Sequence, residues 1–284
     1  MRAHFLSING LRLQCYEWGN PAAPPVVLLH GGSAHSRWWD LFANAIADAY
    51  HVVALDLRGH GNSEHCDPPA YRIEDYAGDV AACIDALGLA RVILIGHSLG
   101  GLVAAAYAGR APERLAALVV VDSQVRISVA GARYMTRLRH FPQLMYRDHD
   151  TAMRRFRLLP TQTNADPQVL AHVAAHAIRQ LPDGRWTLRF DRASLSYPEP
   201  EDRLPTLQQL CCPILLVRGA HSTLLPHDKF TALLAALPQA KGIEIPDAHH
   251  HVMLDNPAEF AHAVRTFLDT VPVPQAAAIA PPHP

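Results

Sequence analysis

The sequence has few charged side chains and almost no net charge. Lys, Arg, Asp and Glu make up 18% of its 284 residues, and their formal balance is -1 at pH 7. A chain without surplus positive charge has no electrostatic basis for binding nucleic acid or an anionic membrane, so we expect neither partner. Hydrophobic residues are 49% of the chain, which excludes a disordered protein and predicts a large buried core.

Paired cysteines and long apolar runs are also missing. The five cysteines are scattered without the spacing of a metal site, which favours free thiols in a reducing compartment. The first ten residues lack the apolar stretch of a secretory signal. No apolar run approaches the length of a membrane-spanning helix. We therefore expect a cytoplasmic protein that does not insert into a membrane.

Short apolar runs alternate with segments of helical length over most of the chain. Strands of continuous apolar character separated by helices indicate an α/β protein with a mostly parallel sheet and helices on both faces. Residues 5–16 predict a hairpin around Asn9 and Gly10, and residues 73–87 and 99–110 predict helices. The apolar runs lie at residues 26–30, 52–57, 92–95, 118–121, 214–217 and 243–245.

The alternation stops between residues 124 and 204. This stretch has helical patches, such as residues 169–180, a signal for a hairpin or turn at residues 182–184 and no obvious strand of the sheet. It also holds 13 Arg against 8 Asp plus Glu. We predict that it is a mainly helical cap, inserted into a core formed by residues 1–123 and 205–270.

Two other segments carry less information about function. Three arginines at residues 154–157 could meet an anionic group, but a solvated helix face explains such a run more often. Residues 271–284 are rich in Pro and Ala without a periodic apolar face, so they are predicted to be disordered.

A serine lies at a sharp strand-to-helix turn. The apolar run at residues 92–95 leads into Gly-His-Ser-Leu-Gly at residues 96–100 and then into a helix. In this setting the motif presents its serine at the carboxyl end of the strand, and its glycines stand where a Cβ would collide with backbone. The start of the helix aims backbone N–H groups at developing negative charge. We predict that Ser98 is the nucleophile of an acyl-transfer reaction.

These features resemble the α/β-hydrolase superfamily. A second glycine motif, His-Gly-Gly-Ser at residues 30–33, follows one strand, and Asp-Leu-Arg-Gly-His-Gly-Asn-Ser at residues 56–63 follows the next. Residues 248–257, with three adjacent histidines before Asp-Asn-Pro, resemble the histidine loop of the family. The resemblance implies an eight-stranded-type α/β-hydrolase sheet and a capped member of the superfamily.

The resemblance also implies an oxyanion hole beside Ser98. Its donors would be the backbone N–H groups of Gly32, after a strand, and of Leu99, at the start of a helix. Ser33 is the alternative to Gly32 as the first donor. Such donors are oriented before the reaction, so they stabilise a tetrahedral oxyanion strongly. Ser33 and His97, next to these donors, are expected to line the substrate pocket.

One of the three adjacent histidines is implied to be the general base. In the family the catalytic histidine stands five residues before the Asp of an Asp-x-Pro element, which here selects His250. His251 is expected to line the pocket, and His249 stands where a glycine is more usual. Consecutive side chains point in different directions, and no Cys, Asp or Glu cluster completes a tetrahedral site. We therefore predict no metal and no organic cofactor.

The acid partner of His250 departs from the family pattern. Relatives often take an Asp from the loop after the strand at residues 214–217, where this sequence has Thr223. Threonine cannot stabilise an imidazolium electrostatically. Asp122 ends an earlier strand, from which some members draw their acid, and Asp228 stands at a predicted helix start. We assign the role to Asp122 and keep Asp228 as the alternative.

These residues together predict a serine hydrolase that cleaves a carboxylic ester or a related acyl substrate of small size. A carbon–carbon bond hydrolase or a lactonase would use the same triad, because the fold does not determine the substrate. The missing carboxylate at Thr223 leaves a third hypothesis, a ligand-binding or signalling protein with weak hydrolysis. The sequence predicts no oligomeric state.

Overall fold

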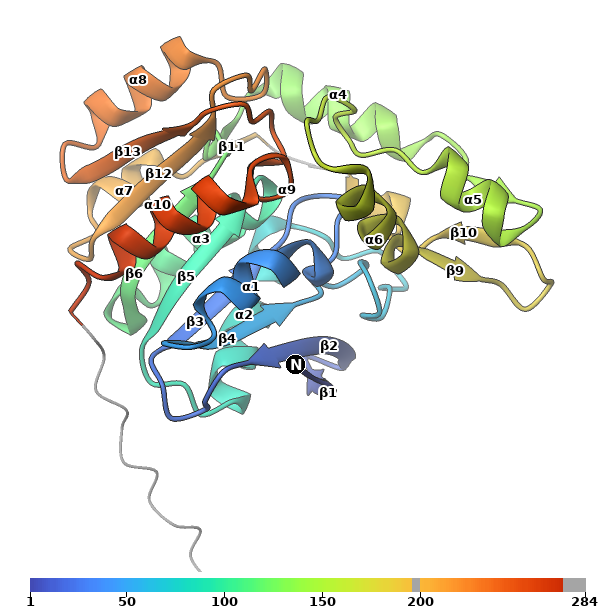
Figure 1. The fold of residues 1–284 in the computed structure, drawn as a ribbon, viewed down its shortest axis with the longest axis horizontal. Coiled ribbons are helices and arrows are strands. Elements are labelled where there is room, and N and C mark those ends of the chain that lie inside the picture. The colour runs from blue at the N-terminus through green and yellow to red at the C-terminus, as the bar shows by residue number, and fades with distance from the viewer. Residues whose placement is uncertain (196–199, 273–284) are drawn as a thin grey trace, which may run out of the picture.

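A single large sheet organises the protein, seen in a computed structural model that describes residues 1–195 and 200–272 (Figure 1). In these residues the strand order of the sheet is β1-β2-β4-β3-β5-β6-β12-β13. The pairs β1·β2 and β2·β4 are antiparallel, and every pair from β4 to β13 is parallel. The strands are β1 (Arg2–Ile8), β2 (Leu11–Trp18), β3 (Pro25–Leu29), β4 (His51–Leu55), β5 (Val92–His97), β6 (Leu115–Val121), β12 (Ile214–Gly219) and β13 (Ala240–Ile245).

The apolar runs of the sequence form the centre of this sheet. Every residue of β4, β5, β6 and β12 is buried, because helices cover both faces. The predicted hairpin is β1–β2, and Asn9 and Gly10 both have the positive φ that its tight turn requires. The predicted mostly parallel, eight-stranded sheet is confirmed within the described residues.

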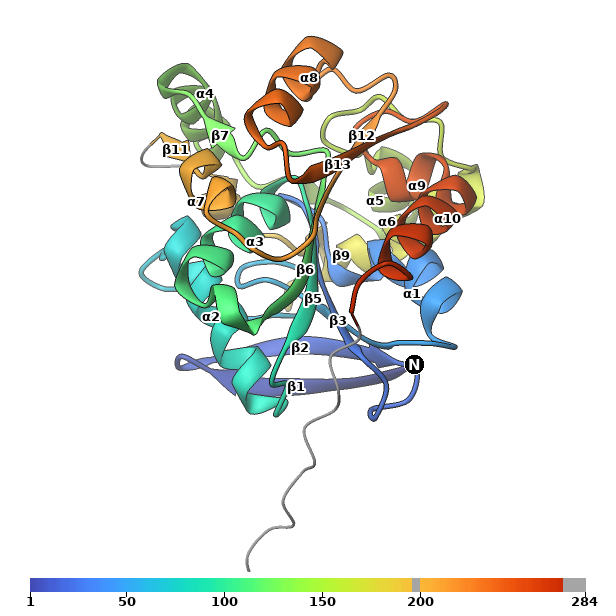
Figure 2. The ribbon, with the colours of Figure 1, turned by 90° about the vertical axis from the view of Figure 1, so that its left-hand side faces the viewer.

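Helices pack on both faces of the sheet (Figure 2). Alternate residues of β3 separate the two layers: Val27 and Leu29 belong to a cluster with α2 and α3, whereas Val26 and Leu28 belong to a cluster with α1 and α10. The helices of the core are α1 (Asp40–Ile46), α2 (Ile73–Ala86), α3 (Leu99–Arg110), α7 (Leu204–Gln208), α8 (His227–Ala236), α9 (Val252–Asp255) and α10 (Pro257–Leu268).

Residues 124–204, called the insert below, contain short strands as well as helices. β9 and β10 form a hairpin whose turn includes Gly184 at a φ of 85°. The helix expected at residues 169–180 ends at Ala177, and β9 begins at the next residue, Ile178. This hairpin lies at the hairpin or turn signal of residues 182–184. The other short strands are not indicated by the sequence, since two or three residues are too few for an alternating pattern. The elements are β7 (Arg126–Ile127), α4 (Val129–Arg139), β8 (Met145–Tyr146), α5 (His149–Arg155), α6 (Pro167–Ala177), β9 (Ile178–Gln180), β10 (Trp186–Leu188) and β11 (Glu201–Asp202).

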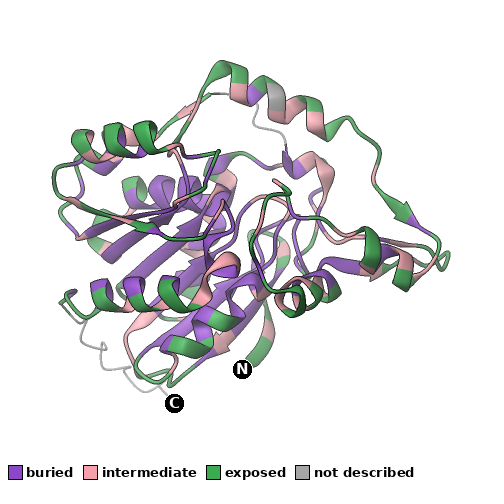
Figure 3. Ribbon diagram, turned by 45° about the horizontal axis from the view of Figure 1, so that its top comes forward, coloured by how far each residue is buried: buried purple, intermediate pink, exposed green. Residues whose placement is uncertain are grey.

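The insert packs against loops that follow the carboxyl ends of the sheet strands. After β3, Nε2 of His35 donates to the carbonyl oxygen of Val173 at 3.0 Å. After β13, Nε2 of His251 donates to the carbonyl oxygen of Pro160 at 2.7 Å. Figure 3 shows the buried strands at the centre and the exposed outer faces of the surrounding helices. The insert therefore meets the sheet at the edge where Ser98 lies.

The last part of the chain lies outside the described residues, which stop at residue 272. The disorder predicted for residues 271–284 therefore stays a prediction. In the described ranges no helix is both long and apolar enough to cross a membrane. The five cysteines are free thiols, and only Cys211 is exposed.

Candidate active site

Ser98 lies at the sharp turn between β5 and α3. Its φ is 52° and its ψ is -114°, a backbone conformation that is strained for any residue with a side chain. A Cβ at Gly96 would lie 2.2 Å from the carbonyl oxygen of Gly100, and a Cβ at Gly100 would lie 2.3 Å from that of Leu29. Gly96 therefore allows the end of β5 to approach the start of α3 closely, and Gly100 allows the start of α3 to approach the end of β3.

Adding a methyl group at Gly100 should destabilise the protein. The new Cβ would overlap backbone atoms of Leu29 and His30, which cannot move without shifting β3. We expect Gly100→Ala to lower the free energy of unfolding by about 2 kcal/mol or more, measured by urea denaturation. Gly78→Ala is the matched control, because its Cβ would meet nothing closer than 3.9 Å and a helical alanine stabilises by about 0.5–1 kcal/mol. Unchanged stability in Gly100→Ala would contradict the close approach.

A buried carboxylate holds the imidazole of His250. Oδ1 of Asp122, at the end of β6, accepts from Nδ1 of His250 at 2.8 Å. The same carboxylate accepts from Oγ of Ser222 at 2.6 Å and from the backbone N–H of Gly219 at 2.8 Å. Asp122 is 1% exposed and His250 is 3% exposed. Because Nδ1 carries the shared proton, Nε2 of His250 has the free lone pair.

Burial sets the protonation of this pair. Burial raises the pKa of Asp122 to about 6, although the hydrogen bonds from Ser222 and Gly219 lower it. The carboxylate is therefore ionised at neutral pH. Burial, followed by the charge of the neighbouring His251, lowers the pKa of His250 well below its usual value. The imidazole is therefore neutral at pH 7, the form that can accept a proton.

Two further histidines surround His250. Nε2 of His97, the residue before Ser98, donates to the carbonyl oxygen of His250 at 2.9 Å, and the centres of the two rings are 4.6 Å apart. The ring of His251 lies 5.2 Å from that of His250. Trp38 lies against both neighbours, 6.3 Å from His97 and 5.2 Å from His251 between ring centres. The His250 ring is thus next to the residue that precedes Ser98.

The backbone N–H groups of Gly32 and Leu99, near Ser98, are among those that donate to no acceptor within residues 1–195 and 200–272. The glycine turn packs against the serine, because a Cβ on Gly31 would lie 3.2 Å from the Cβ of Ser98. His30 orients this turn by donating from Nδ1 to the carbonyl oxygen of Gly31 at 2.7 Å. Burial lowers the pKa of His30 to about 4, so this ring stays neutral. Both free N–H groups are available to an oxygen anion.

A family described as the alpha/beta hydrolase fold matches residues 24–257. The chain belongs to this family. Lipase LipV of Mycobacterium tuberculosis is 30% identical over 271 residues, which are 92% of this chain and 98% of the lipase. The pimeloyl-[acyl-carrier protein] methyl ester esterase of Nitrosomonas europaea is 30% identical over 242 residues, 84% of this chain and 92% of the esterase. The crystal structure of E-2-(acetamidomethylene)succinate hydrolase shares the fold, with a TM-score of 0.82, 22% identity, and coverage of 95% of this chain and 99% of that one.

In this α/β-hydrolase, three residues near the expected positions lie away from the His250 ring. Thr223 is exposed, and Asp228 is exposed in the first turn of α8. His249 turns toward the surface, where its Nδ1 is 3.2 Å from the carbonyl oxygen of His221. Among the described residues, the carboxylate bonded to the His250 side chain is that of Asp122.

Three residues that carry no sequence signal of their own also shape this α/β-hydrolase site. Ser222 and Gly219 orient Asp122, and a Cβ on Gly219 would lie 2.0 Å from the carbonyl oxygen of His249. Gly219 therefore allows the end of β12 to approach the histidine loop. Trp38 lies in a segment without a motif. Of these three residues, only Ser222 could have been predicted to lie in the site, because it directly precedes Thr223, the expected position of the acid.

A small cavity lies between the core and the insert. Its volume is about 20 Å³, and its lining includes Ser33 and Trp38 from the core and Phe156, Ala177 and Phe190 from the insert. That volume is enough for about one water molecule. The insert thus contributes apolar side chains next to the glycine turn of the α/β-hydrolase core.

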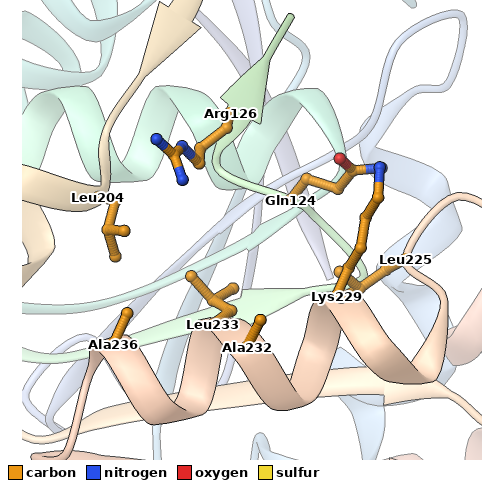
Figure 4. Close-up of a pocket in the computed structure, with 8 residues that line it drawn as sticks. All are labelled: Gln124, Arg126, Leu204, Leu225, Lys229, Ala232, Leu233 and Ala236. Carbon is orange, nitrogen blue, oxygen red and sulfur yellow. The ribbon is translucent and has the colours of Figure 1, made fainter.

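A larger groove of about 290 Å³ lies elsewhere and is lined by none of the candidate site residues. Figure 4 shows Lys229, Leu233 and Ala236 of α8 facing Gln124 and Arg126 at the start of the insert. Size alone does not identify the reactive site of an α/β-hydrolase, since the larger groove holds no nucleophile, base or oxyanion donor.

Proposed function

We propose that the protein is a serine hydrolase that cleaves carboxylic esters of small molecules through an acyl-enzyme. The contact that carries the proposal is the 2.8 Å bond between His250 and the buried Asp122. The His250 ring packs against His97, the residue before Ser98 on its strained turn. A serine hydroxyl is a weak nucleophile unless a base removes its proton, and a histidine oriented by a carboxylate is such a base.

In the acylation step, Oγ of Ser98 attacks the carbonyl carbon of the ester and its proton passes to Nε2 of His250. The imidazolium stays bonded through Nδ1 to Asp122, whose negative charge stabilises it. The N–H groups of Gly32 and Leu99 donate to the tetrahedral oxyanion. Nε2 then returns the proton to the leaving alcohol as the carbon–oxygen bond breaks.

In the deacylation step, the same histidine activates water. Nε2 of His250 takes a proton from the water molecule as its oxygen attacks the acyl carbon, and returns that proton to Oγ of Ser98 when the acid leaves. The residues need no metal or organic group for either step.

Free cysteines in the described structure fit the reducing cytoplasm as the location of this reaction.

The names of the relatives support ester hydrolysis over other reactions of the same triad. Relatives that cover most of the chain include the lipase, the methyl ester esterase, and an esterase of Mycobacterium tuberculosis with 27% identity over 262 residues. At such identities the acyl group and the alcohol of the substrate differ between relatives.

The insert is the element that we expect to select the acyl group, acting as a cap over residues 1–123 and 205–270. Phe156, Ala177 and Phe190 border the small cavity beside Ser33. A larger side chain that fills this space should disfavour esters with long acyl chains. Each methylene of the acyl chain that can no longer enter the pocket lowers kcat/KM for that ester by about tenfold or more.

The test is a panel of p-nitrophenyl esters from acetate to octanoate, with lactones and vinylogous diketones beside them. We expect many equivalents of p-nitrophenol per protein molecule, and about a tenfold shift toward short esters in Ala177→Leu. Ala236→Leu is the matched control, because Ala236 lines only the distant groove and should leave the preference unchanged. Release of a single equivalent would instead indicate a binding protein, and turnover of lactones or diketones alone would refute the ester assignment.

A further inference from the structure

We propose that His97, His250 and His251 form a binding site for Zn²⁺, and that the bound ion stops hydrolysis by occupying His250. The three residues offer ring nitrogens that lie within 4.8 Å of one another. All three side chains are buried: His97 is 1% exposed, His250 3% and His251 0%. They come from β5 and from the loop after β13, so the cluster differs from the three consecutive histidines of the sequence.

Each ring already has its second nitrogen bound to an acceptor. His97 donates from Nε2 to a carbonyl oxygen at 2.9 Å, His251 donates from Nε2 to a carbonyl oxygen at 2.7 Å, and His250 donates from Nδ1 to Asp122 at 2.8 Å. Histidines that bind metals almost always donate their other N–H to a carboxylate or a carbonyl oxygen in this way. These bonds fix the tautomers and leave one lone pair on each ring.

Two of those lone pairs have no partner. Nδ1 of His97 and Nδ1 of His251 are buried without a hydrogen bond among the described residues. Leaving a buried acceptor without a partner destabilises the folded protein, so an unpaired set of this kind requires a physical reason. A cation that accepts both lone pairs, together with that of Nε2 of His250, would supply the missing interactions.

The chemistry of the donors favours Zn²⁺. Three neutral imidazoles are ligands of zinc sites that keep a fourth position for water, and imidazole suits Zn²⁺ far better than Mg²⁺ or Ca²⁺. In a tetrahedral site with Zn–N distances of about 2.0–2.1 Å, the ligand nitrogens lie about 3.4 Å apart. Side-chain rotations that move the ring nitrogens by about 1 Å would bring the three histidines to this spacing. Asp122, bonded to Nδ1 of His250, supplies one negative charge on the opposite side of the imidazole ring from the ion.

The inhibitory half of this inference rests on the proposed function. Nε2 of His250 is the atom that accepts the proton of Ser98, and a nitrogen that binds zinc cannot accept that proton. Zinc binding and ester hydrolysis therefore exclude each other. The binding half stands independently, because it requires only the three rings and their acceptors.

Cobalt is the first probe of the site. Co²⁺ added to the wild-type chain should produce the intense visible bands of a tetrahedral complex at one equivalent, and Zn²⁺ should remove them. A spectrum typical of six-coordinate Co²⁺, or no change in the visible spectrum, would overturn the proposal without the need for any variant.

Calorimetry with Zn²⁺ then locates the ligands. His251→Gln keeps an N–H for the carbonyl oxygen of Pro160 but removes a ligand, so we expect affinity to fall by about 100-fold or more, beyond the effect of losing an orienting partner. His249→Gln, the same change at the neighbour that faces His221, should leave the affinity unchanged. The reverse result would assign the zinc to the surface pair and overturn the proposal.

Hydrolysis of a p-nitrophenyl ester by the wild-type chain tests the inhibitory half. The rate should fall in proportion to the fraction of protein with Zn²⁺ bound, and EDTA should restore it. Hydrolysis that continues with the site filled would refute inhibition. Zinc binding by a chain that hydrolyses no ester would refute the proposed function but support the site, so the two failures are distinguishable.

Discussion

Asp122→Asn is expected to reduce ester turnover by about four orders of magnitude while the protein stays folded. The carboxylate that accepts from Nδ1 of His250 would become an amide. If the amide NH₂ faced the ring, Nδ1 would have to accept, and Nε2 would then carry the proton and be unable to act as a base. The loss of negative charge would also destabilise the imidazolium. Steady-state kcat and circular dichroism measure the two parts of the prediction.

Asp228→Asn is the control for this change. Asp228 is an exposed residue in the first turn of α8, so it should contribute about 1 kcal/mol or less to stability and nothing to proton transfer. The double variant Asp122→Asn with Thr223→Asp moves a carboxylate to the residue after Ser222, and we expect part of the turnover to return. Full activity in Asp122→Asn alone would defeat the assignment and turn attention to Asp228 or to a base without an acid.

The second large effect is expected at the histidine loop. His250→Ala should reduce turnover by about a thousandfold or more, because it removes both the base and the acid of the reaction. His249→Ala, one residue earlier, should cost far less, since the His249 ring points toward the carbonyl oxygen of His221. Measured kcat values for the two variants decide between them. A larger loss in His249→Ala would show that the assignment is wrong by one residue.

The sheet could be predicted from the sequence because its strands are buried on both faces. Continuous apolar runs indicated β3, β4, β5, β6, β12 and β13, although β6 begins at Leu115 rather than at residue 118. The short strands of the insert gave no such signal, because two or three residues are stabilised by pairing with distant partners rather than by their own pattern. The large sheet was therefore more predictable from the sequence than the short strands of the insert.

The sequence likewise indicated some residues of the candidate site and not others. Motifs beside strand ends indicated Ser98, His250 and Asp122, because a local turn or the end of a strand determines where each side chain lies. The approach of His97 to His250 could not be predicted, since those residues are 153 positions apart and only packing joins them. The roles of Ser222 and Gly219 as donors to Asp122 depend on the same long-range packing.

Covalent labelling of Ser98 tests the central claim most directly. A fluorophosphonate phosphonylates an activated serine, with fluoride as the leaving group. Intact mass spectrometry counts the adducts, and peptide mapping locates them. We predict one adduct per chain, on Ser98, and none in a Ser98→Ala protein whose circular dichroism matches that of the wild type. An adduct that persists in folded Ser98→Ala would contradict the account.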